Sequence, residues 1–99
     1  MIFPKGGVPW WREEAIRQRD AALRQLAEMF LPDQTPGARA RIVHEQSRRY
    51  AASSWRFDRD RDAMPETYAG TAKAWLWRAF ASGATMPIGE RQLRTIFGR

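Results

Sequence analysis

Arginine is the residue type in this sequence that is best suited to bind a partner. The chain has 17 lysine and arginine residues against 11 acidic residues, for a formal net charge of +6, and Lys5 and Lys73 are its only lysines. The arginine guanidinium is planar and permanently charged, and it binds phosphates and carboxylates through paired hydrogen bonds. The composition therefore favours a polyanion or an acidic protein surface as partner. A GC-rich genome would also enrich arginine, and this alternative stays open.

Tryptophan is the second unusual residue type, with five positions: Trp10, Trp11, Trp55, Trp75 and Trp77. Residues two apart on a helix point about 160° away from each other, so Trp75 and Trp77 cannot both face a core. We expect Trp77 to be partly exposed. Exposed tryptophans beside arginines either stack on unpaired bases or anchor a protein interface. Packing in the core is the alternative use, and the candidate partner-binding residues are Trp77, Trp10 and Trp11.

Residues for catalysis or metal binding are few. The chain contains no cysteine, and His44 is its only histidine. Glu13 and Glu14 are sequence neighbours that diverge on a helix, which does not suit a paired acid and base. Gly6 and Gly7 lack the lysine and hydroxyl residue of a phosphate-binding loop. We expect no enzymatic activity, no metal site, no cofactor, and a surface or boundary position for His44.

A long stretch without glycine or proline runs from Trp10 to Leu31. Ile16, Leu23 and Phe30 recur there every seven residues, which predicts an amphipathic helix over residues 10–31. Arg19 falls within this apolar stripe. It must therefore extend to solvent along its aliphatic stem or pair with a carboxylate.

Thr35 and Pro36 form an N-cap and first-turn pair that predicts a second helix over residues 36–61. Its expected buried face has small residues between apolar ones, and it consists of Val43, Ser47, Tyr50, Ser54 and Phe57. The short connection before it predicts that residues 10–31 and 36–61 form a long antiparallel hairpin. This face could equally join two hairpins, so the sequence allows a monomer or a homodimer.

Two shorter helices are expected after a connector that contains Pro65 and Gly70. Thr71 is a plausible N-cap for residues 71–82, Gly83 a C-terminal cap, and Pro87 separates this helix from the last one at residues 89–97. No strand pattern competes with these helices. The sequence predicts an all-α single domain over residues 1–99, in which residues 1–9 form an extended arm and 71–97 a pair resembling a helix-turn-helix.

The segment GERQLRTIF at residues 89–97 resembles the recognition helix of helix-turn-helix proteins of the AraC type, which commonly read Ser-x-Arg-x-Leu-x-Arg-x-Phe. Arg91, Leu93 and Phe97 match this pattern, whereas Gly89 and Thr95 depart from it. The resemblance implies contact with DNA through the exposed side of this helix. The candidate nucleic-acid-binding residues are Arg91, Arg94, Glu90, Lys73 and Arg99.

Two functions are therefore predicted from different classes. The first is binding of nucleic acid, with double-stranded DNA favoured, through the C-terminal helix pair. The second is a helical protein-interaction module, an adaptor or inhibitor of the kind that phages and mobile elements encode, which binds an acidic protein surface through arginine and tryptophan. The sequence shows neither a signal peptide nor an apolar run of about 18 residues, so we expect a cytoplasmic protein with no membrane partner.

Overall fold

The computed structural model describes residues 10–98, and all regular structure in this range is helical. The elements are α1 (Trp10–Phe30), α2 (Pro36–Ala52), α3 (Trp55–Asp58), the short 3-10 helix η1 (Glu66–Tyr68), α4 (Ala72–Ala81) and α5 (Glu90–Phe97). The predicted all-α class is confirmed. The arm expected at residues 1–9 lies outside the described residues.

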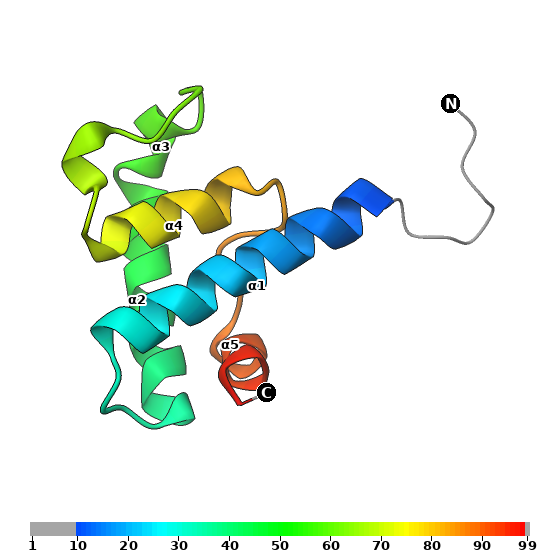
Figure 1. Cartoon of the computed structure of the whole chain (residues 1–99), viewed down its shortest axis with the longest axis vertical. Coiled ribbons are helices and arrows are strands. Elements are labelled where there is room, and N and C mark those ends of the chain that lie inside the picture. The colour runs from blue at the N-terminus through cyan, green and yellow to red at the C-terminus, as the bar shows by residue number, and fades with distance from the viewer. Residues whose placement is uncertain (1–9, 99) are drawn as a thin grey trace.

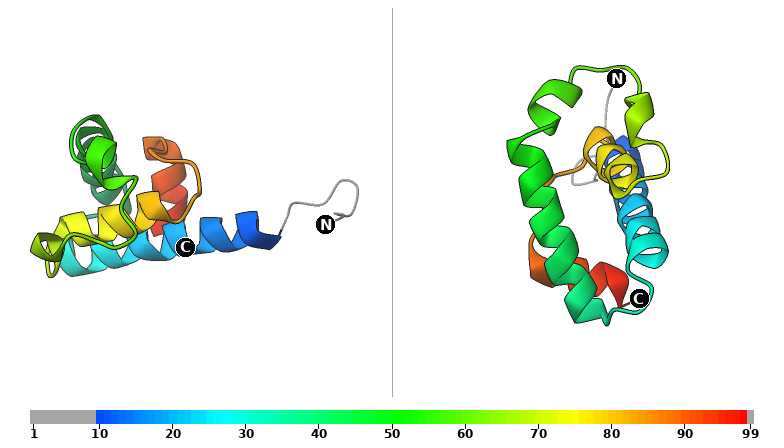
Figure 2. Two further views of the ribbon diagram at one scale, coloured as in Figure 1. Left: turned by 90° about the horizontal axis from the view of Figure 1, so that it is seen from above. Right: turned by 90° about the vertical axis from the view of Figure 1, so that its left-hand side faces the viewer.

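Helix α1 begins and ends close to its predicted bounds, but only its middle is covered by other helices. Its buried apolar residues are Ala22, Leu23, Leu26 and Ala27. Ile16 and Phe30 were expected on the buried face, yet each is 38% exposed, so this part of the prediction is wrong. For Ile16 the reason is visible in Figures 1 and 2, where the first turns of α1 project beyond the rest of the molecule, whereas Phe30 is the last residue of the helix at its other end.

Helix α2 begins as predicted, with the Thr35 hydroxyl accepting a hydrogen bond from the Ala38 N–H at 3.2 Å. It ends at Ala52, so the prediction of one helix to residue 61 is wrong. Ser53 leaves the helical conformation, and its hydroxyl donates to the Arg49 carbonyl at 2.6 Å. The chain then turns into α3, where Phe57 is 74% exposed instead of buried.

The helices pack in an arrangement that the sequence did not predict. Helix α1 packs mainly along α4, and α2 packs mainly against α5. Figure 2 shows α1 and α2 as two sides of the molecule, with α4 and α5 between them. The two helices and the short connection expected for a hairpin are present, but α1 and α2 do not pack along their lengths as an antiparallel pair.

Helices α4 and α5 lie near their predicted bounds, and Gly83 follows α4 with a positive φ of 90°. Their backbones do not approach each other within the described chain, because α5 packs on α2 and α1 instead. The connection between them includes a cis Met86–Pro87 peptide bond. A helix-turn-helix requires its second helix to rest on its first across a short turn. The described residues do not have this geometry.

One hydrophobic core joins these helices. Its buried members come from α1, α2, α4, α5 and the segment before α5: Ala22, Leu23, Leu26, Ala40, Val43, Tyr50, Leu76, Ala79, Phe80, Ile88, Leu93 and Ile96. The Tyr50 and Phe80 rings meet edge to face with centroids 5.0 Å apart. Trp55 packs against the same Phe80 ring at 5.3 Å, which ties α3 to the core.

Candidate binding surfaces

The exposed side of α5 carries the two arginines that the sequence singles out. Leu93 and Ile96 are buried and fix the helix on α2 and α1. Arg91 and Arg94, three residues apart and therefore on one side of the helix, are both exposed. Neither forms an ion pair within residues 10–98. Their guanidinium groups are thus available to an anionic partner.

Arg94 also lies over the beginning of α2. A Cβ atom placed on Gly37 would be 3.8 Å from Arg94 Nε and 3.9 Å from its Cζ. The first turn of α2 carries the partial positive charge of the helix dipole. Arg94 therefore adds its full charge to a region that is already electropositive.

Glu90 lies four residues before Arg94, on the flank of α5 next to α2. It lines a shallow hollow of about 660 Å³ whose charged walls are Arg41, Glu45, Arg48 and Arg49. Arg48 and Arg49 both pair with Glu45, at 3.8 and 3.1 Å. This hollow is therefore less positive than the Arg91 and Arg94 side, and Glu90 belongs to its edge.

Lys73 is not brought together with α5. Its ammonium group donates to the Ser54 hydroxyl at 3.3 Å and lies 5.3 Å from the centre of the Tyr68 ring. Ser54 follows the C-terminal end of α2, whereas Arg94 lies over the start of that helix. With a rise of about 1.5 Å per residue, the length of α2, roughly 25 Å, separates the two positions. Arg99 lies outside the described residues.

A second candidate surface lies between α1 and α4. A mainly apolar hollow of about 470 Å³ is lined by Gln18, Ala21, Ala22 and Gln25 of α1, and by Trp75, Trp77, Arg78 and Ala81 of α4 with Ser82. Arg78 is its only charged lining residue, and its guanidinium carbon lies 4.4 Å from the centre of the Trp75 ring. Both tryptophans are half-buried. The expectation of a partly exposed Trp77 is therefore confirmed. The expectation that Trp75 and Trp77 cannot both face the core is wrong, because both pack against the core cluster.

Trp11 extends this surface beyond the hollow. Positions 11, 14, 18, 21 and 25 alternate three and four residues apart, so they fall on one face of α1. Glu14 on this face accepts hydrogen bonds from Arg17 at 3.0 Å and from Gln18 at 3.3 Å, and these bonds hold the pKa of its carboxyl group below the ordinary value. We call this surface, made of Trp10, Trp11, Glu14 and the lining of the hollow, the α1–α4 face.

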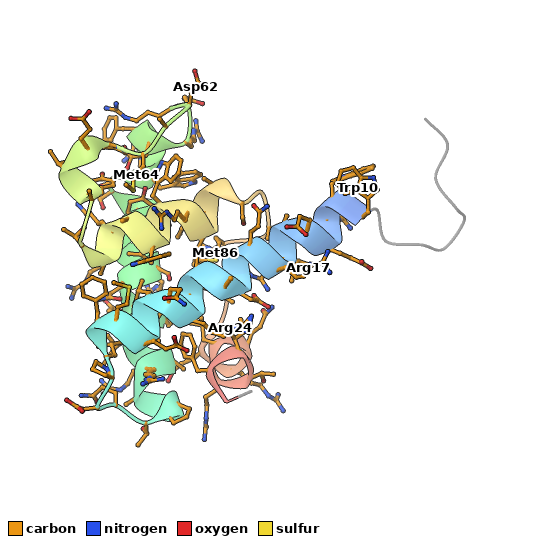
Figure 3. All side chains as sticks on the ribbon, viewed as in Figure 1. Trp10, Arg17, Arg24, Asp62, Met64 and Met86 are labelled. Carbon is orange, nitrogen blue, oxygen red and sulfur yellow. The ribbon has the colours of Figure 1, made fainter. Side chains whose placement is uncertain are left out.

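Trp10 and Trp11 form the projecting end of the α1–α4 face. Trp10 is 69% exposed and Trp11 is 43% exposed, and their rings meet edge to face with centroids 6.0 Å apart. Figure 3 shows Trp10 at the tip of α1, away from the other helices. Two large apolar side chains on a projecting helix end are typical of an interaction site. The structure thus places Trp10, Trp11 and Trp77 on one face.

Two buried polar clusters join the helices and loops that carry these surfaces. Arg19 pairs with Asp20 at 2.9 Å, and both side chains are less than one-tenth exposed. A second Arg19 nitrogen donates to the Thr85 carbonyl at 3.4 Å, which joins α1 to the segment before α5. The prediction that Arg19 pairs with a carboxylate if it does not reach solvent is confirmed.

The second cluster centres on Asp58, which is buried at the end of α3. Its Oδ2 atom accepts hydrogen bonds from the Tyr50 hydroxyl at 2.9 Å and the Tyr68 hydroxyl at 2.7 Å. Arg61 lies 3.5 Å from its other oxygen. Burial, followed by the bond to Asp58, raises the pKa of both tyrosines. This cluster closes the loop between α3 and α4, and its Asp58 and Arg61 line a pocket together with Trp77 and Ala81 of α4.

His44 lies at the boundary of the core, as expected, with Nδ1 3.1 Å from the Ile88 carbonyl oxygen. Residues 10–98 contain no group of three or more histidine, aspartate or glutamate side chains placed to hold a metal ion. Within the same residues, no helix is both long and apolar enough to cross a membrane.

The fold and these surfaces define a small basic all-helical domain. Comparison with protein-family models, with curated proteins and with solved structures gives no match for the chain. The resemblance of residues 89–97 to an AraC-type recognition helix therefore stays a prediction.

Sequence reasoning missed the contribution of Arg78 and Trp75 to the α1–α4 face. The signal in the sequence was the set of positions 11, 14, 18, 21 and 25, which share one helix face, begin with tryptophan and include no basic residue. That set marks one wall of the hollow. The other wall depends on the packing of α4 against α1, which no local pattern specifies.

Proposed function

We propose that this protein binds nucleic acid, with double-stranded DNA favoured, through the exposed side of α5. The observation that supports this proposal most is that Arg91 and Arg94 lie together on that side with no ion pair in the described chain. An arginine held by a neighbouring carboxylate would have to break that pair before it contacted a phosphate. These two do not.

The mode of binding differs from that of a helix-turn-helix protein. Helix α5 is supported by α2 and α1, and the first turn of α2 lies beside Arg94. Phosphate groups bind readily where backbone N–H groups of a helix N-terminus meet arginine. In this proposal α5 lies against the duplex with Arg91 and Arg94 on phosphates or guanine edges, and the start of α2 contacts the adjacent backbone. Such a role agrees with the predicted cytoplasmic location.

A charge-matched pair of double variants tests this proposal. Arg91→Ala with Arg94→Ala removes two charges from α5, while Arg56→Ala with Arg59→Ala, which we call the α3 variant, removes two exposed charges from α3 and the residue that follows it. Binding of a DNA duplex is measured by mobility shift at several salt concentrations. For the α5 variant we expect a weaker affinity, by about tenfold or more, and a salt slope smaller by about 2, since each phosphate contact contributes roughly 0.9.

The α3 variant is expected to bind with nearly the affinity and salt slope of the unaltered protein. Equal losses in both variants would mean that binding depends on total charge alone. No binding of the unaltered protein at low salt, or no change in the α5 variant, would overturn the proposal.

The α1–α4 face supports a second candidate function, that of a protein-interaction module. The specific observation is that Trp10, Trp11 and Trp77 share one face with Arg78, and that no acidic side chain lines the hollow. Tryptophan and arginine dominate the energetics of protein interfaces. An adaptor or inhibitor of the phage or mobile-element type would use this face against an apolar partner surface that carries a carboxylate.

A further inference from the structure

The α1–α4 face has two contrasting parts. Its projecting end carries the large side chains of Trp10 and Trp11. Its inner part is a hollow whose lining includes the small residues Ala21, Ala22 and Ala81. A bulky apolar end and an apolar hollow on the same face are complementary in shape. Because they lie on one molecule, a second copy of that molecule can satisfy both.

The spacing along α1 supports this pairing. Trp11 lies ten residues before Ala21, a distance of about 15 Å along the helix axis. If two copies of α1 lie antiparallel with these faces together, about a twofold axis at the level of residue 16, Trp11 of one copy lies opposite Ala21 of the other, and Glu14 lies opposite Gln18. Both hollows are then filled by the same rotation, and the contact closes as a dimer.

The charges of the two parts are also complementary. On the α1–α4 face the projecting end carries Glu14, which pairs with Arg17 at 3.0 Å, and the hollow has Arg78 as its only charged lining residue. The cation–π contact of Arg78 with Trp75 holds its charge at the edge of the hollow. In the antiparallel arrangement Glu14 of one copy approaches this arginine in the other.

We propose that the α1–α4 face is a self-association surface, on which Trp10 and Trp11 of each copy enter the hollow between α1 and α4 of a second copy of this chain. This inference rests on the second candidate function, that the face binds protein, and it is independent of nucleic-acid binding by α5. A contact of two helices per copy is small, so a dissociation constant on the order of micromolar is expected.

Sedimentation equilibrium of the full chain across a wide range of concentrations tests the proposal. Trp11→Ala removes the projecting side chain, and Ala21→Trp fills the hollow at an exposed helix position. Each variant is expected to weaken dimer formation at least tenfold. Phe57→Ala is the matched control, because Phe57 is also an exposed aromatic residue but lies on α3, outside the face. It is expected to leave the dissociation constant unchanged.

A mixture of the two variants gives a sharper result. The Trp11→Ala copy keeps its hollow and the Ala21→Trp copy keeps its projecting tryptophan, so the mixture is expected to form a heterodimer although each variant alone is a monomer. Circular dichroism checks that both variants stay folded. Recovery in the mixture supports the proposed docking, and no recovery overturns it.

Other outcomes separate this inference from the candidate function beneath it. A dimer that Trp11→Ala does not weaken overturns the inference, because another surface must then form the contact. If the unaltered protein is a monomer at all concentrations, self-association is rejected. Titration with an amphipathic helical peptide that carries glutamate on its polar face then tests whether the face binds protein at all. Binding that Trp11→Ala weakens preserves the interaction module without self-association, whereas no binding rejects both.

Discussion

At the scale of single residues, the structure depends on side chains whose local sequence gives no sign that they are buried. Asp58 falls in a run of alternating charges, RFDRDRD, which reads as a solvated surface. In the fold it is buried and accepts hydrogen bonds from Tyr50 and Tyr68. One carboxylate therefore fixes three segments: the end of α2, α3 and η1.

The two tyrosines predict the response of the protein to alkaline pH. Their pKa values are raised in the folded state, so folding keeps protons that the unfolded chain loses above about pH 10, the ordinary tyrosine pKa. The free energy of unfolding is thus unaffected below that pH and falls as pH rises beyond it, by roughly 1.4 kcal/mol per pH unit for each fully protected tyrosine. Urea titrations from neutral to alkaline pH measure this fall.

Tyr50→Phe supplies the comparison for that measurement. The two proteins differ in this hydroxyl alone, so any difference between their alkaline slopes belongs to Tyr50. We expect a shallower fall for Tyr50→Phe above about pH 10. Equal slopes would show that burial and the bond to Asp58 do not hold the Tyr50 hydroxyl in its protonated form.

At the scale of elements, local sequence signals set where helices begin and end. Thr35 caps α2 through its hydroxyl, and Gly83 follows α4 with φ at 90°. The break after α2 was missed, because Ser53 and Ser54 are weak signals beside the apolar repeat that continues to Phe57. The loop that the Asp58 cluster closes replaces the predicted last turns of that helix.

Gly83→Ala is predicted to destabilise the protein by about 1–2 kcal/mol, because residues with a Cβ rarely adopt this left-handed conformation. A Cβ at this position would meet no atom within 4 Å, so the loss comes from the backbone alone. Gly89→Ser is the control. Gly89 caps α5 with φ at −72° and open space around it, and serine there is expected to be neutral or to stabilise by a few tenths of a kcal/mol. Urea unfolding compares the two, and equal effects would contradict this account.

At the scale of the whole molecule, two helix pairs share one core. Helix α1 packs along α4 and α2 against α5, and Leu23, Val43, Leu76 and Leu93 all belong to the same buried cluster. Figure 1 shows how the chain crosses between the pairs, from α1 to α2, then to α4 and last to α5. Removing a contact in one pair should therefore weaken the other.

Leu93→Ala tests this coupling. Leu93 lies on α5 and is fully buried, and its truncation is expected to lower stability by about 3 kcal/mol. The five tryptophans lie on α1, α3 and α4, so their fluorescence reports helices other than α5. The urea midpoints from fluorescence and from circular dichroism should fall together. A fall in the dichroism midpoint alone would show that α5 unfolds separately.

The sequence by itself determined the helical class, the bounds of α1, α4 and α5, and the capping residues Thr35 and Gly83. These features depend on periodicity and on backbone preferences that act within a few residues. Only the tertiary structure decided that α4 lies along α1, that α5 rests on α2, and that Lys73 lies far from Arg94. Such choices depend on which apolar faces fit together across long sequence separations, and several pairings of four amphipathic helices bury similar areas. The same reason explains why Arg91 and Arg94 could be selected from their local pattern, whereas the hollow beside Trp77 appeared only once α1 and α4 were packed together.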